Sequence, residues 1–290
     1  MKSIENIGKT IGLLIAGIYL IFFQGNSVFE WVFIGIVLIT VGIPHGSIDH
    51  LLLNPTISKN SLMRFIGKYL VIILVYLVIW VLMPVPALIL FLSMSAYHFG
   101  QSHFIQSPLT YYKKSTYFLT GAFYLSVIFW GDFDDTALIL KGIVPIGKMA
   151  TYGWSIILGS FLISNLSVIR NQPERWPRFL IEMVLLGTLL YHLPLLMGFV
   201  LYFGFWHALP SMSAEYTSLK QHFSKQPLKR FVTEMIPFTA VSIAGIGVLL
   251  AILYPRSETE ELILLFFVLI SLISAPHIWF MNRFLEARKS

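Results

Sequence analysis

Long apolar stretches separated by short polar connections cover almost the whole chain. A helix that crosses a bilayer needs about 20 mostly apolar residues. The stretches that fit this length are roughly 7–24, 28–45, 64–83, 86–106, 115–130, 150–169, 178–192, 195–213, 232–254 and 261–281. The pattern predicts an all-α, polytopic transmembrane helix bundle of about ten spans, within a range of about eight to ten.

Two stretches fit this pattern less well. The segment 178–192 is short and contains Glu182. The segment 136–148 is apolar but is interrupted by Lys141, Pro145 and Lys148. We expect 136–148 to form an interfacial or re-entrant piece rather than a span.

Composition agrees with a membrane protein. Of the 290 residues, 57% are hydrophobic and 12% are charged, whereas soluble domains average about 25% charged residues. The chain contains no linker or low-complexity segment, so we expect 1–290 to be a single integral membrane domain. It also contains no cysteine, which excludes disulfides and thiolate metal ligands.

The positions of the charged residues predict an orientation. The chain has 20 basic residues, and all of them except Lys141, Lys148 and Arg256 fall at the termini or in every second connection. Because basic loops stay on the cytoplasmic side, both termini are predicted to be cytoplasmic. The net charge of +6 is therefore explained by the membrane, and we expect no nucleic-acid partner.

Four histidines occur on four different predicted spans: His45, His98, His207 and His277. At a rise of about 1.5 Å per residue, they fall in the cytoplasmic half of the bilayer, within a band of about 8 Å. Ionisable residues at membrane depth are costly and usually functional. The pattern favours a metal site in the bundle core, because neutral imidazole binds iron, copper, zinc and nickel. The alternative is that each histidine only forms hydrogen bonds between helices.

Other polar residues near these histidines are candidates for orienting them. In a continuous helix, residues i and i+5 face about 140° apart, so only one histidine of His45/His50 and one of His98/His103 would face an ion. His50 and His103 are then supporting or structural residues. Asp49 is four residues after His45, on the same helical face, and is a candidate to orient a ligand imidazole. By contrast, His192 at a span end and His222 in a basic loop are expected to be surface or structural residues.

Aromatic side chains cluster next to the histidines. The candidates to line a site for a long, flat, apolar substrate are Tyr97, Phe99, Tyr202, Phe205 and Trp206. Plain packing between helices explains the same residues equally well.

The motifs together resemble the Brp/Blh family of membrane β-carotene 15,15′-dioxygenases. The resemblance rests on Pro44-His45-Gly46 with Asp49-His50, on Tyr97-His98-Phe99-Gly100, on the run Tyr202 to His207, and on Pro276-His277. It extends in consistent order from residue 44 to residue 277.

The resemblance implies an enzyme that uses Fe(2+) and O2 to cleave the central double bond of β-carotene, a lipid-soluble carotenoid, into two retinal molecules. It also implies a multi-pass protein of the plasma membrane that draws its substrate from the lipid bilayer and can hand retinal over to a rhodopsin.

The ligands implied by the matching motifs are His45, His98 and His207. The family motif continues from the third histidine as H-x-x-x-H, but this chain has Ser211 at the last position. We expect His277 to take the place of this histidine as the fourth ligand, and His103 is the next candidate. No catalytic residue is expected beyond the metal ligands.

Several alternatives stay open. One is a family member that binds carotenoid or retinal without cleaving it, which the departure at Ser211 favours. A second is a membrane transporter, although Glu182 is its clearest intramembrane carboxylate. A third is a haem protein with His98 and His207 as axial ligands. A desaturase-like di-iron enzyme is disfavoured, because the chain lacks the H-x-x-x-H and H-x-x-H-H patterns.

Overall fold

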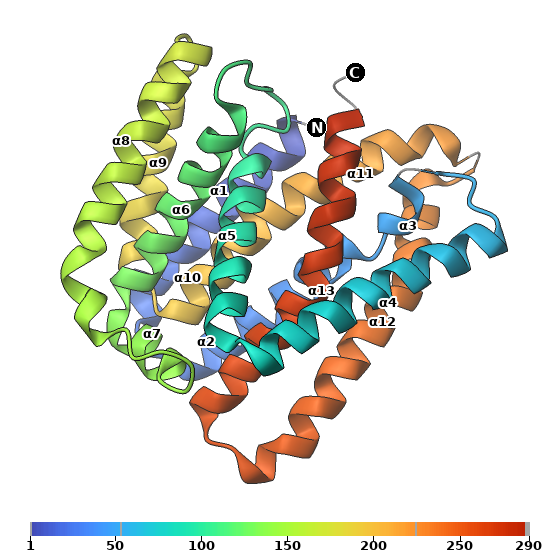
Figure 1. Ribbon diagram of the computed structural model, residues 1–290. Helices are drawn as coiled ribbons and strands as arrows, with labels where there is room; N and C mark the ends of the chain where they lie inside the picture. The colour runs from blue at the N-terminus through green and yellow to red at the C-terminus, as the bar shows by residue number, and fades with distance from the viewer. Residues whose placement is uncertain (1, 53, 224, 288–290) are drawn as a thin grey trace. The chain divides into compact units, whose positions relative to one another are not determined.

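The computed structural model describes residues 2–52, 54–223 and 225–287, and throughout these ranges the regular structure is helical, without a strand (Figure 1). Each predicted span coincides with helical structure. The all-α prediction is therefore confirmed. Arg288 and Lys289, which contribute to the predicted cytoplasmic C-terminus, lie outside the described residues.

Seven helical segments among the described residues are long and apolar enough to cross a membrane. They are Ile4–Phe23, Ser27–Leu52, Lys59–Leu82, Gly147–Asn171, Leu195–His222, Pro227–Arg256 and Thr259–Ala287. The chain is thus a multi-pass membrane protein. The predicted spans 86–106, 115–130 and 178–192 are helices outside this set, so the count of about ten and the orientation of the termini stay predictions.

The chain forms two compact units. Unit 1 comprises Met1–Gly42, Ser95–Lys141 and Pro145–Ser211, and unit 2 comprises Ile43–Met94, Gly142–Val144 and Met212–Ser290. Two of the boundaries fall within helices, α5 (Pro84–Ser102) and α11 (Leu209–Leu219).

Unit 1 is built around α6 and α10. Its helices are α1 (Lys2–Ile18), η1 (Tyr19–Phe23), α2 (Ser27–Val37), η2 (Leu38–Gly42), the second part of α5, α6 (Lys113–Gly131), α7 (Phe133–Leu140), η4 (Gly147–Tyr152), α8 (Gly153–Asn171), α9 (Trp176–Tyr191), α10 (Leu195–Tyr202), η5 (Phe203–Ala208) and the start of α11. Helix α6 packs against α8, α9 and α10, while α1 packs against α9 and η5. Nearly every residue of α10 is buried. The eight-residue α7 is too short to cross a bilayer, which agrees with the prediction for 136–148.

Unit 2 is built around α13. Its helices are η3 (Pro44–Gly46), α3 (Asp49–Leu52), α4 (Lys59–Leu82), the first part of α5, the rest of α11, η6 (Lys220–His222), α12 (Pro227–Leu253), η7 (Tyr254–Arg256) and α13 (Thr259–Ala287). Helix α13 packs against α3, α4 and α12, and α12 also packs against η3. Two hydrogen bonds join α4 to α13: the Trp80 indole N–H donates to the Ser271 hydroxyl over 2.9 Å, and the Tyr69 hydroxyl donates to the Ile273 carbonyl over 3.1 Å.

Exposed apolar side chains form rows on the outer helices. On α4 the exposed residues include Val71, Leu74, Val75 and Val78, which recur at helical spacing. Rows of this size are rare on soluble monomers. Lipid is the solvent that suits them.

Helices α5 and α6 approach each other closely at Gly100 and Gly121. A Cβ atom on Gly121 would overlap the backbone of Ala96, and one on Gly100 would overlap the backbone of Tyr117. Only glycine allows this approach, which brings α6 against the part of α5 that carries His98.

We expect Gly121→Ala to destabilise the protein by about 1–3 kcal/mol or more, because neither backbone can yield without separating the helices. The measurement is thermal unfolding in detergent. Gly159→Ala on α8 is the matched control, since nothing lies within 4 Å of its added Cβ, and helix propensity predicts a gain of up to about 1 kcal/mol. Equal melting temperatures for the two variants would contradict the close approach.

Candidate metal centre

The first histidine pair lies in unit 2 and consists of His45 and His277. Their rings meet edge to face with centroids 4.6 Å apart, their candidate ligand nitrogens lie within 4.8 Å of each other, and both side chains are buried. The backbone explains the approach: a Cβ on Gly46 would lie 3.3 Å from His277 Nδ1, so glycine leaves room for the ring. Helix α2 does not continue through His45, since Pro44 begins a short 3-10 turn.

Asp49 orients His277. Its carboxylate lies 2.9 Å and 3.0 Å from His277 Nδ1, and it is buried. Because an ionised carboxylate only accepts hydrogen bonds, Nδ1 carries the proton and the lone pair is on Nε2. A carboxylate behind an imidazole is the usual support of a metal-binding histidine. We had expected Asp49 to act on His45, its neighbour in sequence, but the structure places it against His277 on another helix.

Glu215 is a second buried carboxyl group in unit 2. Its side chain is fully buried, and neither carboxylate oxygen has a hydrogen-bond partner among the described residues. A carboxyl group buried without a partner is costly unless it is protonated or balanced by a cation.

The second histidine pair lies in unit 1 and consists of His98 on α5 and His207 on η5. The ring centroids are 4.5 Å apart at an angle of 70°, the candidate ligand nitrogens lie within 4.8 Å of each other, and both side chains are buried. His207 lies in a π-helical turn that precedes Pro210. Since proline lacks an N–H and crowds the carbonyl four residues earlier, it disturbs the α-helical bonds here. Such π-turns are frequent at functional sites.

Ser102 orients His207 in the same way as Asp49 orients His277. The Ser102 hydroxyl donates to the His98 carbonyl over 3.3 Å, and its oxygen lies 2.7 Å from His207 Nδ1. In the tautomer whose Nδ1 carries the proton, the Ser102 oxygen accepts from Nδ1–H and the lone pair is on Nε2. The sequence analysis missed Ser102, although it lies four residues after His98 on one face of α5.

The two remaining histidines of the i, i+5 motifs lie outside these pairs. His50 packs against Phe238 and lines a cavity of about 240 Å³ in unit 2. His103 follows the end of α5, stacks on Tyr124 and forms a 3.1 Å hydrogen bond with the Tyr202 hydroxyl. His192 and His222 are exposed, as expected.

The predicted aromatic residues are distributed over different surroundings in unit 1. Phe99 and Tyr202 are buried together, and Phe99 also contacts the His207 ring at 4.5 Å. Trp206 is buried beside Glu182. Phe205 is half-buried against Gly12 of α1. Tyr97 packs on Tyr117 in a separate hydrophobic cluster. Of the five, Phe99 contacts a histidine of the pair directly.

The donor set suits a transition metal. The described residues include four buried histidines that could hold a metal ion, two in each unit. In each unit, an oxygen atom contacts Nδ1 of one histidine, His277 or His207. The Nε2 atom on the far side of that ring is then the candidate metal ligand. Imidazole is a ligand for iron, copper, zinc and nickel. The residue types, their tautomers and the buried carboxylates therefore fit a divalent cation.

Comparisons with known proteins agree over nearly the whole chain. A sequence model of the family "Beta-carotene 15,15′-dioxygenase" matches residues 13–285. The chain is 24% identical over 277 residues to "Probable beta-carotene 15,15′-dioxygenase Blh" of Halobacterium salinarum, which covers 83% of this chain and 80% of that protein. It is 25% identical over 268 residues to "Beta-carotene 15,15′-dioxygenase" of an uncultured marine bacterium, which covers 88% of this chain and 93% of the relative. No solved structure matches.

We expect Asp49→Ala to weaken metal binding by about 10- to 100-fold, because the His277 ring loses the partner that fixes its tautomer. The measurement is titration of the purified, metal-free protein with Fe²⁺ or Co²⁺. Asp134→Ala, which removes an exposed acid, is the control and should leave the affinity unchanged. Equal affinities for the two variants would exclude a supporting role for Asp49.

Proposed function

Because the chain belongs to the beta-carotene 15,15′-dioxygenase family, we propose that it cleaves the central double bond of β-carotene with O2 to give two molecules of retinal. The metal is Fe(2+). Its ligands are His45, His98, His207 and His277. The two buried histidine pairs, each with an oxygen on one Nδ1, carry this proposal.

Iron supplies the activation of O2, and four imidazoles leave up to two coordination positions open for it. The protein holds the ligand side chains in position. Asp49 and Ser102 contact Nδ1 of His277 and His207, so the Nε2 atoms of these two rings are the ones that would hold the ion. Neutral imidazoles bring no charge of their own into the bundle, and the Asp49 carboxylate offsets part of the charge of the cation.

The hydrocarbon substrate offers no hydrogen-bonding group, so its position depends on shape. In unit 1, the rings of Phe99, Phe199 and Phe203 form one group beside His207. Flat, rigid aromatic walls suit a conjugated polyene. The substrate enters sideways from the bilayer, since it is dissolved there.

The remaining features of the proposal follow from the membrane. The chain is a single domain of the plasma membrane with both termini in the cytoplasm, as its basic connections favour. The product retinal leaves into the bilayer, where a rhodopsin can accept it.

The haem alternative conflicts with the geometry of unit 1. Axial ligands must lie on opposite faces of a macrocycle, whereas the rings of His98 and His207 are in edge-to-face contact at 4.5 Å. This contact leaves no room for a porphyrin between them.

Expression in cells that accumulate β-carotene tests the function. We expect retinal in the extracted pigments of cells with the wild-type protein. The variants His45→Ala, His98→Ala and His207→Ala should each produce no retinal and bind no iron. His192→Ala, at an exposed histidine, is the control and should keep near-normal activity. Unchanged β-carotene with a folded, iron-loaded protein would indicate a binder that does not cleave, and a folded protein without iron would favour a transporter.

The departure at Ser211 provides a second test. Ser211 is buried and lies four residues after His207. If His277 replaces the missing histidine of the family motif, Ser211→His should restore iron binding to the His277→Ala variant, at least in part. Iron content per protein is the measurement, and the melting temperature of Ser211→His alone shows whether the larger ring is accommodated. A well-folded double variant without iron would contradict this replacement.

A further inference from the structure

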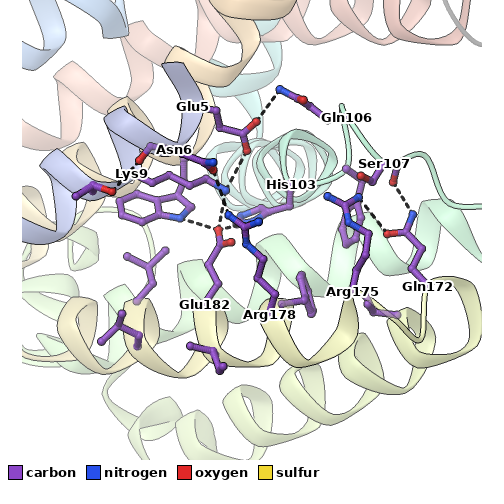
Figure 2. A pocket seen from close by; sticks show the side chains of 18 of the residues that line it. Glu5, Asn6, Lys9, His103, Gln106, Ser107, Gln172, Arg175, Arg178 and Glu182 are labelled. Atoms are coloured by element: carbon purple, nitrogen blue, oxygen red, sulfur yellow. Dashed lines mark hydrogen bonds and ion pairs between the residues drawn. The ribbon is translucent and has the colours of Figure 1, made fainter. Parts of the chain in front are cut away.

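Glu182 on α9 is a carboxylate on which side chains from three other parts of unit 1 converge. Lys9 Nζ on α1 lies 2.8 Å from Oε1, and the indole N–H of Trp206 on η5 donates to the same oxygen over 2.9 Å. His103 Nδ1 lies 3.7 Å away. Figure 2 shows Glu182 pointing toward Lys9, with His103 nearby. Hydrogen bonds to an ionised carboxylate are charge-assisted, so the bonds from Lys9 and Trp206 to Glu182 are stronger than neutral ones.

This carboxylate lies between a polar cavity and the buried interior of unit 1. The cavity has a volume of about 650 Å³, and its lining includes Glu5, Arg175, Arg178 and Glu182 (Figure 2). The Glu182 side chain is 26% exposed, whereas that of His103 is 2% exposed. His103 in turn bonds to the Tyr202 hydroxyl, and the Tyr202 ring packs against Phe99. Glu182, His103 and Trp206 all line this cavity.

Trp206 connects the network to the candidate metal centre, because it directly precedes His207 in η5. Its ring is buried against α1, where a Cβ on Gly12 would lie 2.9 Å from Cζ3. The π-helical turn is disturbed by Pro210 and has weaker backbone constraints than an α-helix. The indole bond to Glu182 joins this turn to α9.

We propose that Glu182 is a positioning residue that holds η5 through Trp206, and so sets the direction in which His207 presents Nε2 to the metal. This role rests on the proposed metal centre. Glu182 does not touch substrate or metal. It acts through the indole.

Four single variants and the Trp206→Phe/Glu182→Leu double variant, all full-length and in detergent, test the role. Trp206→Phe removes the indole donor, and Glu182→Leu removes its acceptor. Glu182→Gln keeps an amide oxygen that can accept from the indole. Trp176→Phe is the matched control, since it also loses an indole N–H bond within unit 1, to Asn165 over 3.1 Å. Two readouts are measured: the affinity and visible spectrum of bound Co²⁺, and hydrogen exchange of the 203–208 backbone in the metal-free protein.

We expect Trp206→Phe and Glu182→Leu each to weaken Co²⁺ binding by about ten-fold and to shift its spectrum, as loss of a supporting partner does. The double variant should be no weaker than either single one, because both break the same bond. Exchange at 203–208 should rise in both. Glu182→Gln and Trp176→Phe should retain the wild-type spectrum.

Three results would overturn the proposal in different ways. If the wild-type protein binds Co²⁺ and both Trp206→Phe and Glu182→Leu keep its spectrum, affinity and exchange, Glu182 has no positioning role, but the metal centre is unaffected. A wild-type protein that binds neither Fe²⁺ nor Co²⁺ would overturn the metal centre and this role together. If Glu182→Leu shifts the spectrum and Trp206→Phe does not, Glu182 does not act through the indole, which also contradicts the proposal.

Discussion

Lipid supplies no hydrogen bonds, so every polar side chain inside this helical protein depends on a partner within the protein. This constraint governs how the buried histidines are held. His277 has the Asp49 carboxylate and His207 has the Ser102 hydroxyl, each over less than 3.1 Å. The supports are short side chains on neighbouring helices. Close helix packing is therefore a requirement of the chemistry as well as of stability.

The helices meet these demands through local departures from regular geometry. Gly100 and Gly121 let α5 and α6 approach until their backbones touch. The 3-10 turn at Pro44 and the π-turn before Pro210 carry His45 and His207. Each departure uses a residue that a regular helix avoids, glycine or proline. In membrane helices these residues are tolerated where neighbours satisfy the backbone groups that they leave.

Two kinds of charged group occur, one in each unit. Asp49 is buried in unit 2 against His277, where a cation would balance its charge. Glu182 in unit 1 already has its cation in Lys9, and it faces a polar cavity. The first arrangement suits metal binding. The second suits the mechanical role of fixing a helix, because its charges are balanced within the protein.

The sequence by itself determined the helices and the histidines. A stretch of about 20 apolar residues has one stable form in a bilayer, so each predicted span is helical, and the isolated histidines at His45, His98, His207 and His277 were evident against that apolar background. The supports were decided only by tertiary structure. Asp49 was assigned to His45 by helical spacing but contacts His277, 228 residues away in the chain. The burial of Glu215 and the role of Ser102 were likewise invisible, because a hydrogen bond between helices depends on which faces meet, and spacing along one helix does not specify that.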